Sequence, residues 1–208
     1  MGSKKNKKSI QRSIKRVADL ICSIIGIILL FPLFLIVAII IKMDSKGSVF
    51  FLQDRVGLSG KIFKIWKFRT MVPGAEKIGL GFSVEKNDSR ITRVGVFLRR
   101  FGIDELPQLV NIIKGEMSVV GPRATLVHQV EQYTEFEKQR LKVRPGVTNI
   151  NLTKGWNTLS WKKRIEWDVW YINNWSLWMD LKILARTPFV VLSGKGQYGE
   201  AGVVEDYK

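Results

Sequence analysis

The feature that most constrains this chain is an apolar run from Leu20 to Ile41 that contains no charged residue. As an α-helix the run would be about 33 Å long, which is enough to cross the hydrocarbon core of a bilayer. A cleaved signal peptide would have a shorter apolar core and a small-residue cleavage site, whereas Lys42, Asp44 and Lys46 follow this run. We therefore expect a permanent membrane anchor.

Pro32 lies in the middle of the run, where its missing N–H and its ring kink or break a helix. Two arrangements follow. Bilayer physics alone favours a straight or kinked transmembrane span, because every backbone polar group must be satisfied within the lipid. The alternative is a re-entrant helix that breaks at Pro32 and returns to the same face. Basic residues flank both ends of the run, and the positive-inside rule would keep both ends cytoplasmic, which favours the re-entrant form.

The charge of the chain indicates an anionic partner. Its formal net charge is +16, and residues 1–16 carry seven basic residues and no acid. Nucleic acid, acidic lipid headgroups and phosphorylated substrates all fit such a surface. Six of the seven tryptophans lie within residues 156–178 among lysines and arginines, which is typical of amphipathic helices on a membrane surface. Stacking on single-stranded nucleic acid is the alternative. Because the anchor already requires a membrane, no nucleic-acid partner is expected.

Local patterns predict a single α/β-type domain, mostly helical with a small β-hairpin, on the N-terminal anchor. The predicted boundaries are a basic segment over 1–16, a re-entrant membrane helix over 17–42, a cytosolic catalytic domain over 43–193 and a tail over 194–208. Aromatic and β-branched residues predict the hairpin over 48–55 and 61–71, followed by a mobile loop over 72–91. Helices are predicted over 92–101, 105–114, 126–141, 161–173 and 177–192.

An acidic pair, Asp104-Glu105, opens the second of these predicted helices. Such a pair is usually a cap that interacts with the helix dipole. Here basic residues surround it in the sequence, and carboxylates among arginines suit a metal–phosphate site in which the acids hold Mg²⁺ and the arginines bind phosphate oxygens. The surrounding basic residues are Arg90, Arg93, Arg99, Arg100, Lys114 and Arg123. Cys22 is the only cysteine, which excludes an internal disulfide, and His128 is the only histidine, which leaves almost no material for a His-based metal site or a Ser–His catalytic pair.

Six motifs in order resemble the small monotopic phosphoglycosyl transferases, a bacterial sugar transferase family, from about Lys15 to Phe189. The motifs are Lys15-Arg16 with Asp19, Gln53 to Gly57, Phe63-Lys64 with Lys67 to Met71, Asp104 to Leu109, Gly115 to Arg123, and Val143 to Thr148. The chain departs from the family at Phe31-Pro32, at Ala124 and over residues 149–156, where an expected arginine has no counterpart.

The resemblance implies a broken, re-entrant helix at Pro32 with both ends in the cytoplasm, at the bacterial cytoplasmic membrane. It implies a UDP-sugar and a polyprenol phosphate such as undecaprenyl phosphate as substrates, together with membrane lipids as partners. Asp104 would be the nucleophile that forms an acyl-phosphate sugar and releases UMP, and Glu105 would help to hold Mg²⁺ or steer the acceptor. Asp104 and Glu105 are thus the predicted catalytic and metal-binding pair. The predicted phosphate-binding residues are Arg99, Arg123, Lys64, Lys67 and Arg144.

Several alternatives stay open at this stage. Lys64, Lys67 and Arg69 also fit a solvated strand face. Lys15 and Arg16 are expected to contact lipid headgroups, and Asp19 to pair with one of them. The non-enzymatic alternative is a membrane-tethered basic scaffold that recruits glycan enzymes or binds an acidic polymer. The sequence leaves the transferred sugar and the oligomeric state open, a homodimer included.

Overall fold

The computed structural model describes residues 2–79, 81, 83–198, 203 and 204. Most of these residues are helical, and three small two-stranded sheets account for the strands, so the predicted mostly helical class with a small hairpin is confirmed. The elements are α1 (Gly2–Asp44), β1 (Phe50–Val56), η1 (Leu58–Gly60), β2 (Ile62–Phe68), η2 (Ala75–Lys77), β3 (Val84–Glu85), α2 (Arg93–Arg100), η3 (Ile103–Gln108), α3 (Leu109–Lys114), β4 (Ser118–Val120), α4 (Val127–Glu131), η4 (Glu137–Lys142), β5 (Gly146–Thr148), α5 (Ile150–Lys154), η5 (Trp156–Thr158), α6 (Trp161–Asn174), α7 (Leu177–Ser193) and β6 (Val203–Val204).

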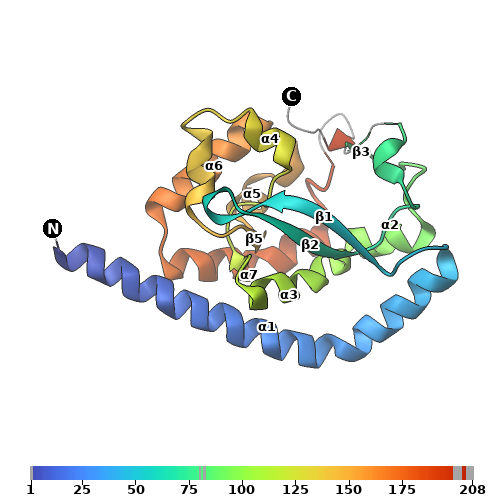
Figure 1. The fold of residues 1–208 in the computed structure, drawn as a ribbon, viewed down its shortest axis with the longest axis horizontal. Helices are drawn as coiled ribbons and strands as arrows, with labels where there is room; N and C mark the ends of the chain where they lie inside the picture. The colour runs from blue at the N-terminus through green and yellow to red at the C-terminus, as the bar shows by residue number, and fades with distance from the viewer. Residues whose placement is uncertain (1, 80, 82, 199–202, 205–208) are drawn as a thin grey trace.

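Helix α1 is the single helix within the described residues that is long and apolar enough to cross a membrane. The predicted break at Pro32 is wrong, because Pro32 lies inside one continuous helix. A proline removes one intrahelical hydrogen bond and can bend a helix without ending it. Figure 1 shows α1 as a long curved helix, with the other elements on its concave side. The helix begins at Gly2, so it also includes residues of the basic segment over 1–16.

The outer side of α1 is not covered by the rest of the chain. Ile28 and Leu29 are 67% and 72% exposed, whereas Val37 and Ile41 on the inner side are buried. These two buried residues pack with Phe68 of β2 and Leu98 of α2. Burial of such side chains contributes about 1.5–3 kcal/mol each, so the second half of α1 is firmly attached to the domain.

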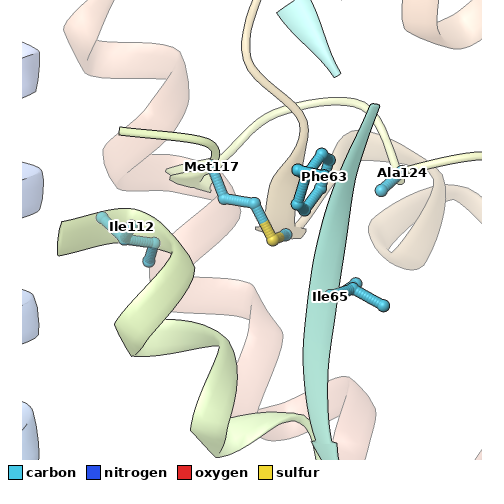
Figure 2. Close-up of a cluster of buried hydrophobic side chains, with 5 residues drawn as sticks. All are labelled: Phe63, Ile65, Ile112, Met117 and Ala124. Atoms are coloured by element: carbon cyan, nitrogen blue, oxygen red, sulfur yellow. The ribbon is translucent and has the colours of Figure 1, made fainter. Parts of the chain in front are cut away.

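The hairpin formed by β1 and β2 is antiparallel, with Phe50 opposite Phe68 and Val56 opposite Ile62, as predicted. Its inner face packs on α3. Figure 2 shows this cluster, in which Met117 lies between the helix and the strand. Its buried residues are Phe63, Ile65, Ile112, Met117 and Ala124.

A parallel pair of strands was not predicted from the sequence. Strands β4 and β5 pair with Ser118 opposite Gly146 and Val120 opposite Thr148. Val120 belongs to a further buried cluster that contains residues of α5, α6 and α7. The strands approach closely at Gly121 and Gly146, because a Cβ added to Gly146 would overlap the backbone nitrogen of Gly121. Glycine is therefore required at this crossing.

Two other predictions on secondary structure need correction. The helix predicted over 126–141 is wrong: α4 ends at Glu131, and a new helical turn starts where Thr134 and Glu137 hydrogen-bond each other's backbone N–H groups. The segment over 72–91 contains η2 and β3, and it is organised around the buried Arg90, which donates to four backbone carbonyl groups of residues 75–83. The helices predicted over 161–173 and 177–192 are confirmed as α6 and α7.

Candidate active site

The acidic pair is positioned by a turn between two helices. Thr92 caps α2 by accepting a hydrogen bond from the Gly95 N–H at 3.0 Å. After α2, Gly102 adopts a left-handed conformation with φ 67°, and η3 begins with Asp104 and Glu105 in its first turn. The predicted single helix over 105–114 is therefore a 3₁₀ turn followed by α3.

The buried Asn111 fixes this helical segment against the hairpin. Its side chain accepts from the Trp66 N–H at 3.0 Å and donates to the Lys64 carbonyl oxygen at 2.7 Å. These two bonds hold α3, and with it η3, at a constant position along β2. They place Lys67 of β2 opposite Glu105.

Glu105 is bound by two cationic side chains from different parts of the chain. Its Oε1 atom accepts from Lys67 Nζ at 2.8 Å and from Arg123 Nη2 at 2.9 Å. Burial alone would raise the pKa of Glu105, but Arg123 and Lys67 hold it well below its usual value. Glu105 is thus ionised and already neutralised at any physiological pH.

Asp104 has a different environment, although it is the adjacent residue. It is 7% exposed and forms no ion pair within the described part of the chain. Burial raises the pKa of Asp104 to about 6, Glu105 adds to this effect, and Lys67, Arg99 and Arg123 oppose it. The Glu105 carboxylate is therefore engaged by cations, whereas the Asp104 carboxylate forms no ion pair within the described residues.

The three cations near Asp104 also differ. Lys67 is partly buried, and burial lowers its pKa while Glu105 opposes that effect. Glu105 raises the pKa of Arg123, whose side chain is half exposed. Arg99 lies within 3.5 Å of the Thr70 hydroxyl and acts on the charge of Asp104. The structure thus brings Asp104, Glu105, Lys67, Arg99 and Arg123 together.

Other predicted site residues lie elsewhere. Lys64 pairs with Asp54 at 3.2 Å on the exposed hairpin face, because an odd spacing from Lys67 puts it on the opposite side of the strand. Arg144 donates to the Gly115 carbonyl oxygen and lines a separate cavity. Arg90 binds Asp88 and lowers the pKa of that carboxyl to about 2.

The membrane-proximal residues of α1 also differ from prediction. Lys15 pairs with Asp180 of α7 at 2.6 Å, and Arg16 donates to the carbonyl oxygens of residues 112 and 113 at the end of α3. Asp19 accepts from the Ser118 hydroxyl and from the backbone N–H of residue 119 rather than pairing with a neighbouring cation. These three side chains attach α1 to the domain.

Two residues near the acidic pair, Gln108 and Arg55, belong to motifs given above but had no predicted role. Gln108, four residues after Asp104, is buried, and its Nε2 atom has no hydrogen-bond partner. It lines a small pocket together with Lys67, Arg123 and Arg55 of β1. The signal that could have found Gln108 is its place one helical turn after the acidic pair.

The side chains at this site can supply only part of the coordination shell of a magnesium ion. No cluster of three or more metal-ligating side chains occurs within the described residues. Mg²⁺ commonly takes one or two carboxylates together with substrate phosphate oxygens and water. The buried Asp104 carboxylate without an ion pair, next to Glu105, can supply such a carboxylate set.

Comparison with known proteins decides the family. The profile described as "Bacterial sugar transferase" matches residues 10–194, which is most of the chain. The chain belongs to the bacterial sugar transferase family.

Several relatives within this family are similar over most of this chain. It is 43% identical over 194 residues to the UDP-glucose:undecaprenyl-phosphate glucose-1-phosphate transferase of Klebsiella pneumoniae, which covers 88% of this chain and 41% of that protein. It is 39% identical to the uncharacterized sugar transferase EpsL of Bacillus subtilis (strain 168), covering 88% of this chain and 89% of that one. It is 38% identical to the exopolysaccharide production protein ExoY of Rhizobium meliloti (strain 1021), covering 88% of each. The chain thus spans about two fifths of the Klebsiella sugar transferase and most of the two shorter relatives.

Proposed function

We propose that this bacterial sugar transferase moves a sugar 1-phosphate from a UDP-sugar to a polyprenol phosphate such as undecaprenyl phosphate, as the first membrane step of glycoconjugate assembly. The observation that carries the proposal is the asymmetric pair: Glu105 is neutralised by Lys67 and Arg123, while the buried Asp104 carboxylate forms no ion pair. The name of the Klebsiella relative describes the same class of transfer, with glucose 1-phosphate and undecaprenyl phosphate.

The reaction proceeds in two displacements at phosphorus. An Asp104 carboxylate oxygen attacks the sugar-linked phosphorus, the bond from that phosphorus to the UMP oxygen breaks, and UMP leaves. A phosphate oxygen of the acceptor then attacks the same phosphorus, and the acyl-phosphate bond breaks to restore the Asp104 carboxylate. No proton has to be removed from the nucleophile, because a carboxylate is ionised above its pKa.

The neighbouring cations stabilise the charge that moves through this site. Lys67, Arg99 and Arg123 surround Asp104, and preorganised cations around a phosphoryl group are the main source of stabilisation in such transfers. The buried Gln108 lies beside Lys67 and Arg123, and its Nε2 atom has no hydrogen-bond partner in the described residues. When bound, Mg²⁺ would neutralise phosphate oxygens, with Asp104 and Glu105 as its protein ligands.

We also propose that α1 is re-entrant through the curvature of one continuous helix, without a break at Pro32, and that the catalytic domain lies on the cytoplasmic face of the bacterial inner membrane. The same domain holds both flanks of the apolar run: Asp19 binds β4 before it, and Asp44 accepts from the Val94 N–H after it. A straight span would place these two residues on opposite sides of the bilayer. Exposed apolar residues of α7, namely Trp178, Leu181, Leu184, Phe189 and Leu192, favour an interfacial position for that helix.

The test of the chemistry is isotope exchange without any lipid acceptor. Labelled UMP should enter UDP-sugar when only the enzyme and a UDP-sugar, with UDP-glucose tested first in a panel, are present. Asp104→Asn should abolish exchange, because a neutral amide is a very poor nucleophile. Exchange that strictly required polyprenol phosphate would mean that the acceptor attacks directly, and Asp104 would not be the nucleophile.

Topology has a separate test. Cys22 is the only cysteine, so Cys22→Ala provides a cysteine-free background. Cysteines introduced near residue 9 and residue 46 should both react with reagents from the cytoplasmic side only. Labelling of one site from outside the cell would exclude the re-entrant form.

A further inference from the structure

A second cavity, of about 310 Å³, lies between the first half of α1 and the part of the domain formed by β4, residues 142–144 and the end of α6. This volume is at the lower end of the range of about 300–1,000 Å³ that is typical of ligand pockets. None of the five residues gathered at Asp104 lines it. Its charged lining residues are Lys8, Arg12, Lys15, Arg16, Lys142 and Arg144, with Asp19 as the only acid.

The positive charge of this cavity is largely unneutralised. Lys15 is paired with Asp180, but none of the other five basic residues forms an ion pair within the described part of the chain. The carboxylate oxygens of Asp19 accept hydrogen bonds from the Ser118 hydroxyl and from the Val119 N–H. Arg16 and Arg144 line the same cavity, and burial together with the nearby charge of Arg144 lowers the pKa of Arg16, while Asp19 opposes this effect. An anion in the cavity would relieve this repulsion.

A purely structural role explains only part of the cluster. Arg16 and Arg144 donate to carbonyl oxygens at the end of α3, so they stabilise that helix terminus. The side chains of Lys8, Arg12 and Lys142 form no hydrogen bond or ion pair within the described residues, although they line the same cavity. Three exposed cations around a cavity of this size are typical of a site for an anionic group.

The first half of α1 places this cavity beside the lipid. Ile10, Ile14, Val17 and Ile21 are each about half exposed and form one stripe along the helix. The cavity-lining residues of α1 lie two positions away from members of this stripe, and two residues turn about 200° around a helix, so the two sets face opposite sides. The apolar stripe continues into the anchor at Leu20, and the cavity therefore lies at the level of the headgroups.

We propose that this cavity binds the phosphate headgroup of an acidic membrane phospholipid, separately from the phosphates that react at Asp104. The basic lining takes the phosphate oxygens, and the apolar wall of Val143, Ile172 and Trp175 contacts the adjoining glycerol and upper acyl chain. A reacting acceptor phosphate has to reach Asp104, which is not part of this lining. The proposal rests on the membrane placement of α1 in the proposed function, and not on the identity of the sugar donor or the acceptor.

The test measures lipid retention by the full chain in detergent micelles, using native mass spectrometry with phosphatidylglycerol or phosphatidylcholine added. The cavity variant carries Lys8→Gln, Arg12→Gln and Lys142→Gln. The matched control carries Lys77→Gln, Lys86→Gln and Lys162→Gln, which removes the same net charge from exposed positions that do not line the cavity. The wild type should retain phosphatidylglycerol over phosphatidylcholine, and the cavity variant should lose about tenfold or more of this retention, since each basic residue beside an acidic headgroup strengthens binding several-fold. The control variant should retain phosphatidylglycerol like the wild type.

Three results would overturn the proposal. Equal loss in both variants would mean diffuse electrostatic attraction. Displacement of phosphatidylglycerol by equimolar polyprenol phosphate, with a raised KM for that acceptor in the cavity variant, would identify the cavity as the acceptor site. Equal competition by millimolar inorganic phosphate would identify a site for free phosphate. UMP exchange measured on the same samples separates the two proposals, because its absence from the wild type would contradict the proposed function while the retention data still decide the lipid site.

Discussion

Replacing Asp104, the proposed nucleophile, should stabilise this protein at neutral pH while it abolishes exchange. The pKa of Asp104 rises from its usual 3.8 to about 6 on folding, mainly because the carboxylate is buried. This difference is about 2 pKa units, and at about 1.4 kcal/mol per unit it corresponds to about 3 kcal/mol of folding free energy lost to keeping Asp104 ionised. Asp104→Asn has nearly the same shape and no charge, so it should recover an amount of this order.

The pH dependence gives the sign of the effect. Between about pH 4 and pH 6 the folded state binds more protons at Asp104 than the unfolded state, so this group makes stability fall as pH rises. Below pH 4 the carboxyl is protonated in both states and the penalty is absent. The stability gap between Asp104→Asn and the wild type should therefore open between pH 4 and pH 6 and stay constant above.

The assay is thermal unfolding in detergent micelles at a series of pH values, with both proteins at equal concentration. A 200-residue protein changes its Tm by about 2–4 °C per kcal/mol, so the gap at pH 7.5 should be about 6–12 °C. An unchanged or lower Tm of Asp104→Asn at pH 7.5 would refute the reasoning that burial dominates the energetics of Asp104.

Glu105→Gln is the matched control, because its expected sign is opposite. Lys67 and Arg123 hold the pKa of Glu105 below its usual value despite burial, so its charge contributes stability that is present at neutral pH and is lost as pH falls through the folded pKa. Removing that charge also leaves the buried Lys67 without its partner. Glu105→Gln should therefore lower the Tm at pH 7.5, and a rise would contradict the assignment of the two roles.

Three further outcomes are expected. Exhaustive chelation with EDTA should abolish sugar-phosphate transfer and added Mg²⁺ should restore it, whereas full activity after chelation would remove the metal from the proposed mechanism. Arg140→Met should cost about 3–5 kcal/mol in thermal unfolding because it leaves the fully buried Asp168 unpaired, and adding Asp168→Asn should recover part of the loss. Gly146→Ala should cost about 3 kcal/mol because its Cβ would overlap the backbone of Gly121. Gly60→Ala has open space around it and only the strain of a left-handed φ of +80°, so it should cost about 1 kcal/mol; equal losses would contradict the close crossing of β4 and β5.

Patterns over short distances in the sequence were enough for most of the helices and for the hairpin. The apolar run and the periodicity of α6 and α7 report directly on local structure, because side chains three or four residues apart share a helix face. They could not reveal β4 and β5, which are three residues each and pair across 28 positions of sequence, since so short a strand carries no periodicity of its own. Asn149 and Asn151, in a segment that departs from the family pattern, cap α5 and bind Asp168, and this packing role is also visible only in the folded chain.

For the site, the sequence by itself determined that an acidic pair within a basic chain follows a membrane anchor, because residue type and order carry that information. Only the tertiary structure decided which cations reach the pair. Lys67 and Arg123 come from positions 38 and 18 residues away from Glu105, whereas Arg90, which is nearer to it than Lys67 in sequence, binds Asp88 instead. The physical reason is that the pKa of a carboxylate depends on its burial and on its distance from neighbouring charges. Both depend on how β2, η3 and the segment after β4 pack together. The same packing raises the pKa of Asp104 and lowers the pKa of Glu105, although the two residues are adjacent in the chain.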